Sequence, residues 1–201
     1  MIIRSIVSSI SFSHCENNTA FTAGLDKKLR IFRIASNNKS NLTQSVFFHD
    51  MPVFSAKYMN NFKEIICTGK RKHFYIYDVN SNKSNRCPGI SSHFEEIKSL
   101  ERVFVGDNNF AFGSLDGYVL LYDNISKSFM YDIKINGSVN SVCFSGNNYF
   151  LVVGDQSEIY LFDQRKNKRC LMKFPDVGNF NTNAMTLSKD NKFLATSNST
   201  N

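Results

Sequence analysis

Four segments of the chain share one pattern of apolar and polar positions. Each contains an apolar run that ends in an aromatic residue, and in three of the four an aspartate follows that aromatic directly. The aligned aromatics are Phe32, Tyr77, Tyr122 and Phe162, spaced by 45, 45 and 40 residues. A glycine precedes each of them by eight or nine residues, at Gly24, Gly69, Gly113 and Gly154. Two markers that keep one period indicate an internal repeat.

The positions around each glycine predict strands. Every one of these glycines lies at or near the end of a further apolar run, such as 65–69, and an alternating stretch lies upstream. In residues 139–145, Val142 and Phe144 alternate with small polar residues, which predicts a strand with one buried face. The following segment 146–148, Gly-Asn-Asn, predicts a tight hairpin. Each repeat therefore contains four short antiparallel strands joined by turns.

Four short strands in about 40–45 residues are typical of a β-propeller blade of the WD-repeat kind. The aromatic-Asp pairs stand where that class of protein places Trp-Asp, and Tyr or Phe keeps a large side chain there. A β-sandwich with evenly spaced hairpins is the alternative, but it has no reason to repeat an aromatic and a glycine in register. We therefore predict an all-β WD-repeat β-propeller that spans residues 1–201 as one domain.

The chain length predicts an incomplete ring. Residues 183–197 repeat the first two strands of the unit, and a third strand is expected where the sequence stops at Asn201. The 201 residues hold about four and a half blades, whereas a seven-bladed ring needs roughly 300 residues. We expect that C-terminal blades are missing from this sequence.

Composition narrows the class of protein. Apolar residues make up 42% of the chain and charged residues 20%, which excludes a disordered tail. No apolar run approaches the ~20 residues of a membrane-spanning helix, so we expect no membrane association. Five cysteines without a Cys-x-x-Cys pair favour a reducing compartment over a disulfide framework.

The net charge of +7 favours an acidic partner, and the basic residues cluster. The candidate contact residues are Lys27, Lys28, Lys70, Arg71, Lys72, Arg165, Lys166, Lys168 and Arg169. Those of segments 27–28 and 70–72 fall in the turns between the second and third strands of successive blades, so we expect them on one face. Those of segment 165–169 fall between third and fourth strands and should project from the opposite face.

Three interpretations of these basic turns remain open. They can be solvated turns that serve solubility, a contact for an acidic protein, or a salt-sensitive contact for RNA phosphates. The sequence shows no interleaved aromatic platform of the kind that stacks RNA bases.

The sequence contains no enzyme signature. Phosphate-binding glycine loops, nucleophile elbows and zinc-binding helix motifs are all missing from it. His14-Cys15 is the only place where a histidine and a cysteine are adjacent, and a zinc site needs about four ligands. Asp78, Asp123 and Asp163 are expected to cap the turn that follows each third strand. We predict no catalytic residue, no cofactor, no metal and no small-molecule substrate.

Several segments resemble one family in the right order. The segment 68–78, Thr-Gly-Lys-Arg-Lys-His-Phe-Tyr-Ile-Tyr-Asp, resembles a distinctive blade of the U3 small nucleolar RNA-associated protein 18 family. The segments 23–32, 52–56, 134–139 and 174–178 resemble further family motifs in succession. The resemblance covers nearly the whole chain.

The resemblance implies a non-catalytic scaffold in the nucleus and nucleolus. Family members are WD-repeat components of the UTP-B subcomplex of the small-subunit processome, and they serve pre-18S ribosomal RNA processing. The implied partners are other WD-repeat processome proteins, and U3 small nucleolar RNA or pre-ribosomal RNA. This sequence lacks the long N-terminal extension with which some members recruit an exosome-associated helicase, so that activity is not inferred. A generic WD-repeat adaptor from another pathway is the alternative function.

Overall fold

The computed structural model contains strands and turns in every part of the chain that it describes. It describes residues 5–13, 18–35, 40–59, 63–71, 73–87, 97–102, 109–145, 149–154, 158–163, 169–175, 182–188, 190 and 192–198. These residues form two compact units, 1–89 and 90–201. No helix long and apolar enough to cross a membrane occurs among them.

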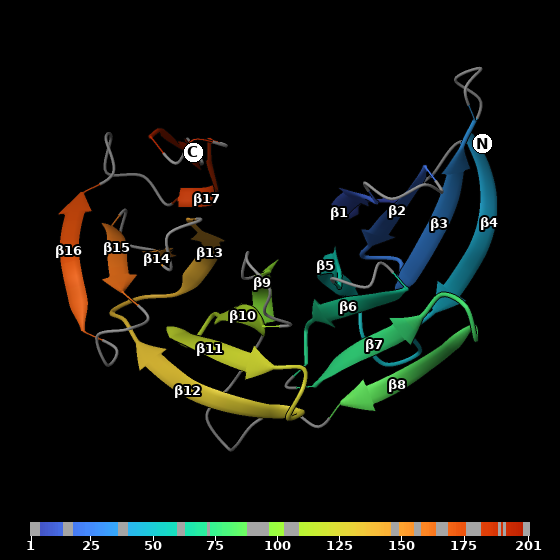
Figure 1. Cartoon of the computed structure of the whole chain (residues 1–201), viewed down its shortest axis with the longest axis horizontal. Coiled ribbons are helices and arrows are strands. Elements are labelled where there is room, and N and C mark those ends of the chain that lie inside the picture. Colours follow the sequence, from blue (N-terminus) through green and yellow to red (C-terminus); the bar gives the residue numbers. More distant parts are fainter. Residues whose placement is uncertain are drawn as a thin grey trace. The chain divides into compact units, whose positions relative to one another are not determined.

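The first unit contains two four-stranded antiparallel sheets, each a simple meander in chain order (Figure 1). The strands of the first sheet are β1 (Val7–Phe12), β2 (Thr19–Gly24), β3 (Lys28–Ile34) and β4 (Ser40–Phe47). Those of the second sheet are β5 (Val53–Tyr58), β6 (Glu64–Gly69), β7 (Phe74–Asp78) and β8 (Lys83–Cys87). The predicted aromatics Phe32 and Tyr77 lie on the third strand of each sheet, as the repeat requires.

The second unit repeats this architecture in two sheets and a hairpin. Its third sheet consists of β9 (Ile97–Arg102), β10 (Asn109–Ser114), β11 (Tyr118–Asp123) and β12 (Ser128–Lys134). Its fourth sheet consists of β13 (Val139–Phe144), β14 (Tyr149–Gly154), β15 (Glu158–Asp163) and β16 (Cys170–Pro175). The hairpin pairs β17 (Thr182–Leu187) with β18 (Leu194–Asn198). The predicted four blades and the first half of a fifth are thereby confirmed.

Each unit has one core between its two sheets. In the first unit, apolar side chains of both sheets bury one another, among them Phe21, Leu29, Val53, Ile65 and Tyr77. The corresponding cluster of the second unit includes Val119, Leu121, Val139, Val142 and Phe162. Removing such side chains from water stabilises each sheet pair by about 1.5–3 kcal/mol for every large residue buried.

Strand β13 corrects one expectation. Alternation predicted one buried face, but Val139, Asn140, Val142, Cys143 and Phe144 are all buried. The reason is tertiary, because β13 packs against β9 on one side and against β17 on the other. The hairpin expected at 146–148 lies outside the described residues.

The repeated glycine marks a close approach of the chain to itself. A Cβ on Gly69 would lie 1.9 Å from the carbonyl oxygen of Pro52, the residue that precedes β5. At the equivalent Gly24 it would lie 2.6 Å from the carbonyl oxygen of Ile6, which precedes β1. Neither site has room for a side chain. In the third sheet the equivalent residue is Ser114 and not Gly113. Ser114 pairs with Ile97 at the start of β9, and the register of the two strands shifts between Gly113 and Ser114.

A bulge lies at this position in all five sheets of the described residues, whether or not the residue on the second strand is glycine. The first strand gains one residue over the second strand at this end, for example between Val7 and Ser9 or between Val53 and Ser55. The extra residue bends the first strand and increases its twist.

The repeated aromatic ties neighbouring sheets together in the first unit. The Tyr77 hydroxyl lies within hydrogen-bond distance of the side-chain oxygens of Gln44 (2.9 Å) and Asn82 (2.5 Å). Gln44, on β4 of the first sheet, also donates its amide to the Val79 carbonyl at 3.0 Å. A tyrosine therefore supplies both bulk and a polar link between two blades.

The aspartates after the third strands cap turns, as predicted for Asp78 and Asp123. Asp78 Oδ1 accepts from the Asn80 amide at 2.8 Å, and Asp123 Oδ1 accepts from the Ile125 amide at 2.8 Å. Both turns end in a residue with positive φ, Asn82 at 56° and Lys127 at 54°. The residues that follow Asp163 lie outside the described part, so its capping stays a prediction.

The substitution Gly69→Ala tests the close approach. Because its Cβ would meet backbone atoms of Pro52, we expect the unfolding free energy of the first unit to fall by about 2–4 kcal/mol. The control is Gly154→Ala, whose Cβ would lie 3.2 Å from the Asn136 carbonyl oxygen and should cost clearly less. Urea denaturation of both variants measures the difference, and equal losses would contradict this account.

Candidate functional site

Two basic turns of the first unit occupy the same position in successive sheets. Lys27 and Lys28 lie where β2 passes into β3, and Lys70 and Arg71 lie where β6 passes into β7. Lys28, Lys70 and Arg71 are exposed, and Lys27 is half-buried. Their predicted location between second and third strands is confirmed.

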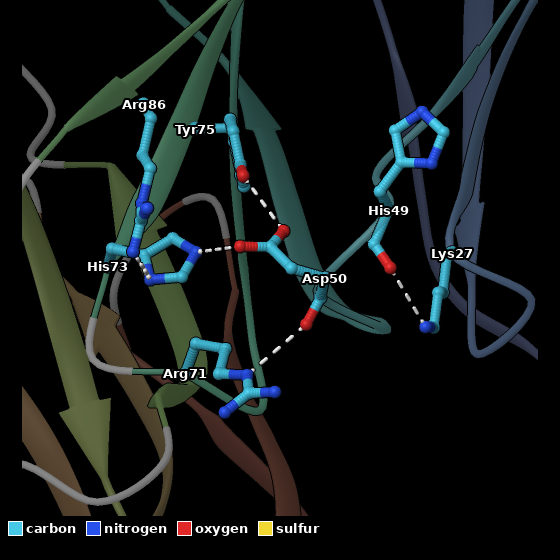
Figure 2. Close-up of polar contacts among 7 residues, drawn as sticks. All are labelled: Lys27, His49, Asp50, Arg71, His73, Tyr75 and Arg86. Atoms are coloured by element: carbon cyan, nitrogen blue, oxygen red, sulfur yellow. Dashed lines mark hydrogen bonds and ion pairs between the residues drawn. The ribbon is translucent and has the colours of Figure 1, made fainter.

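The connection between β4 and β5 joins these two turns (Figure 2). The Lys27 ammonium donates to the backbone carbonyl of His49 at 3.0 Å. The Arg71 Nε donates to the carbonyl of the next residue, Asp50, at 3.2 Å. The residues on either side, Phe48 and Met51, are buried and fix the connection in the core. Adjacent peptide groups thus hold one cation from each turn.

The Asp50 side chain points toward the second sheet (Figure 2). Its Oδ1 accepts from the Tyr75 hydroxyl at 2.8 Å, and its Oδ2 lies 3.0 Å from His73 Nε2. Burial opposes ionisation of Asp50, but the Tyr75 hydrogen bond and the nearby His73 and Arg86 outweigh it and lower its pKa. Asp50 is therefore ionised, and its charge is directed at Tyr75 and His73.

His73 is a buried residue held in its neutral form. Burial and the positive charge of Arg86 lower its pKa, and Asp50 only partly offsets them. An Arg86 Nη lies 3.1 Å from His73 Nδ1, and a guanidinium can only donate, so Nδ1 accepts and the ring proton sits on Nε2. Within the described residues Nε2 has no hydrogen-bond partner, although it lies at ion-pair distance from Asp50. The imidazole ring of His73 thus lies between the Arg86 guanidinium and the Asp50 carboxylate.

Lys27 adopts a backbone conformation that favours glycine. Its φ is +62°, and the equivalent residue of the third sheet is Gly117, with φ +84°. The two positions match because the Lys27 carbonyl accepts from the Phe48 amide at 2.8 Å, as the Gly117 carbonyl accepts from the Ile135 amide at 2.9 Å. A non-glycine residue in this region costs about 1 kcal/mol.

Asp26 offsets part of the positive charge of the turn between β2 and β3. Its Oδ2 pairs with the Arg30 guanidinium, and its Oδ1 accepts from the Lys28 amide at 3.3 Å. Burial opposes the shift, but these contacts lower the Asp26 pKa, so the carboxylate neutralises Arg30. The exposed ammonium of Lys28 lies outside this pair.

Most of the other predicted contact residues lie outside the part of the chain that the structure describes. Lys72, Arg165, Lys166 and Lys168 lie outside the described residues, as do His14 and Cys15. Arg169 is exposed just before β16, so the 165–169 cluster does fall between a third and a fourth strand. Its projection from the opposite face stays a prediction. The described side chains include no group of three or more residues that could hold a metal ion.

Charge is divided unequally between the two units, which sequence analysis missed. Residues 1–89 contain 13 Lys and Arg against 5 Asp and Glu, a net charge of +8. Residues 90–201 contain 11 against 12, a net charge of −1. Counting charges on each side of residue 89 would have found this, whereas the roles of Asp50, His73 and Arg86 have no sequence signal of their own.

Comparisons with known proteins agree with this fold. The family model "WD domain, G-beta repeat" matches residues 130–163. The chain is 32% identical over 173 residues to the U3 small nucleolar RNA-associated protein 18 homolog of Arabidopsis thaliana, 86% of this chain and 31% of that protein. It is 26% identical over 192 residues to the homolog of Homo sapiens, 94% of this chain and 34% of that protein.

A third relative is the probable U3 small nucleolar RNA-associated protein 18 of Schizosaccharomyces pombe, 25% identical over 178 residues. That match covers 87% of this chain and 34% of the relative. The chain spans about a third of the length of the curated relatives that it matches. The WD-repeat β-propeller fold and the family resemblance expected from the sequence are both confirmed.

The buried neutral His73 predicts a pH dependence of stability. Because its folded pKa lies below its ordinary value of about 6.5, the unfolded chain takes up the proton first. The free energy of unfolding of the first unit should therefore reach its full value above about pH 6.5 and decrease as the pH falls below it.

Thermal denaturation between pH 5 and 7.5 measures this effect. His73→Gln, which cannot titrate, should flatten the pH dependence of the unfolding temperature. An unchanged slope in His73→Gln would contradict the assignment.

Proposed function

We propose that this WD-repeat chain, which is similar over most of its length to the U3 small nucleolar RNA-associated protein 18 family, acts in ribosome biogenesis as part of a U3-containing particle. The observation that carries the proposal is the match to relatives from a plant, an animal and a fungus, over 86%, 94% and 87% of this chain. Such a match spans four sheets and not only a single generic repeat.

In the proposed role the chain is a scaffold of the small-subunit processome, within its UTP-B subcomplex, and supports pre-18S ribosomal RNA processing. Its partners are other WD-repeat processome proteins, together with U3 small nucleolar RNA or pre-ribosomal RNA, in the nucleolus. The fold supports this role because rigid meander sheets present short turns and connections as contact surfaces. No catalytic step, cofactor or small-molecule substrate belongs to the proposal.

Purification of the tagged full-length protein from its own cells tests this function. We expect U3 small nucleolar RNA and several WD-repeat proteins to be enriched over an identically tagged, unrelated WD-repeat protein. Depletion should lower mature 18S RNA relative to the large-subunit RNA and cause precursors to accumulate.

Recovery of neither U3 RNA nor processome proteins would overturn the proposal. In that case, diffuse cytoplasmic localisation together with a different set of bound proteins would support the alternative, an adaptor in another pathway, since the propeller fold alone does not determine function.

A further inference from the structure

We propose that the basic end of the first unit binds the phosphate backbone of single-stranded RNA. This anchored basic surface consists of Lys27, Lys28, Lys70 and Arg71, arranged around the connection that carries His49, with Phe47 at its side. The inference rests on the proposed function and adds to it the part of the chain that touches RNA and the chemistry of the contact.

The first argument is the distribution of charge. The first unit carries +8 and the second −1, so almost any polyanion will be attracted to the first unit. The nearby acids face basic residues outside this surface, since Asp26 pairs with Arg30 and the positive charge of Arg86 acts on Asp50. The exposed basic residues of the two turns therefore determine the local potential.

The second argument is that two of the cations are held in place. Lys27 and Arg71 are bound to the adjacent carbonyls of His49 and Asp50, at 3.0 and 3.2 Å. Arg71 uses only Nε for this bond, and its terminal nitrogens have no partner among the described residues (Figure 2). A guanidinium fixed in this way presents its planar end to a phosphate with less loss of side-chain entropy on binding.

The third argument is the backbone of Lys27. The third sheet uses glycine at this position, and the first sheet accepts a lysine at positive φ instead. A positive charge at this turn is the gain that a glycine could not supply.

An exposed aromatic ring distinguishes RNA from an acidic protein as the partner. Phe47 is 46% exposed and pairs directly with Lys28 across β3 and β4, so both side chains lie on one face. Its ring meets the exposed His49 ring edge-on, with centroids 4.8 Å apart. In the third sheet the equivalent pair has the two residue types exchanged, with Tyr118 on β11 and Lys134 on β12, and the Lys134 ammonium lies 4.2 Å from the Tyr118 ring centroid.

Phosphate-binding cations beside an exposed ring are the combination that single-stranded nucleic acid requires. The sequence showed no such aromatic because Phe47 and the basic turns are brought together only by strand pairing.

Fluorescence anisotropy with a labelled, mixed-sequence 20-nucleotide single-stranded RNA tests the proposal on the 201-residue chain. The logarithm of the affinity should fall linearly with the logarithm of salt concentration, with a slope of about −3 for four phosphates. Lys28→Gln with Lys70→Gln should lower affinity at least tenfold in low salt and reduce the slope by about 1.4. The charge-matched control, Lys127→Gln with Lys192→Gln on exposed positions of the second unit, should change affinity less than twofold.

Two single variants separate the contributions. Lys27→Gly should weaken RNA binding without lowering the melting temperature, because glycine suits the positive φ at this turn. Phe47→Ala should weaken RNA binding about tenfold with an unchanged salt slope, since stacking does not release counterions.

Equal losses of RNA affinity in the double variant of Lys28 and Lys70 and in the charge-matched control would overturn the inference. So would a glutamate-rich peptide that binds as tightly as the RNA and displaces it, because that result assigns the surface to an acidic protein. The two proposals fail separately. If turn variants lose no affinity for RNA while the tagged protein still recovers U3 RNA, the proposed function stands and this contact is wrong.

Discussion

The close passage of the chain at the ends of β2 and β6 is the constraint on which the candidate site depends. At Gly69 and Gly24 the backbone that enters the first strand runs so near that no side chain fits. This contact keeps the entering connection beside the turn between the second and third strands of the same sheet. In the first unit it brings the His49–Asp50 peptide groups next to Arg71, while Phe48 binds the first turn at Lys27. The candidate site is therefore a consequence of blade geometry.

Electrostatics and burial then determine which charged groups near the two basic turns of the first unit are available to bind a partner. The apolar residues Phe48 and Met51 anchor the connection, so its carbonyls can hold Lys27 and Arg71 in fixed positions. Tyr75 binds the ionised carboxylate of Asp50, which also lies against neutral His73, and the positive charge of Arg86 acts on it. Isolated surface charges interact weakly in water, at about 1 kcal/mol for a pair 4 Å apart. Two cations in fixed positions, with further basic residues in the same two turns, are what make a polyanion the fitting partner.

Sequence patterns predicted the blades well because period, glycine and aromatic each reflect a local requirement. Gly69 reports a backbone contact, Tyr77 fills space between the two sheets of the first unit, and Asp78 caps a turn with its carboxylate. The patterns failed where a tertiary neighbour decides the outcome. Both faces of β13 are buried because strands lie on either side of it, and Ser114 replaces the expected glycine because a bulge shifts the register. The basic turns were predicted, whereas the roles of Asp50, His73 and Phe47 depend on contacts that single-sequence patterns do not encode.

The central claim is that RNA contacts the first unit at its basic turns. Ultraviolet crosslinking of the full-length protein to RNA in its purified particle, followed by mass spectrometry of the crosslinked peptides, tests it most directly. The account predicts crosslinks within residues 1–89, in peptides that contain Phe47 or the 25–30 and 69–75 turns. Crosslinks confined to residues 90–201 would contradict it.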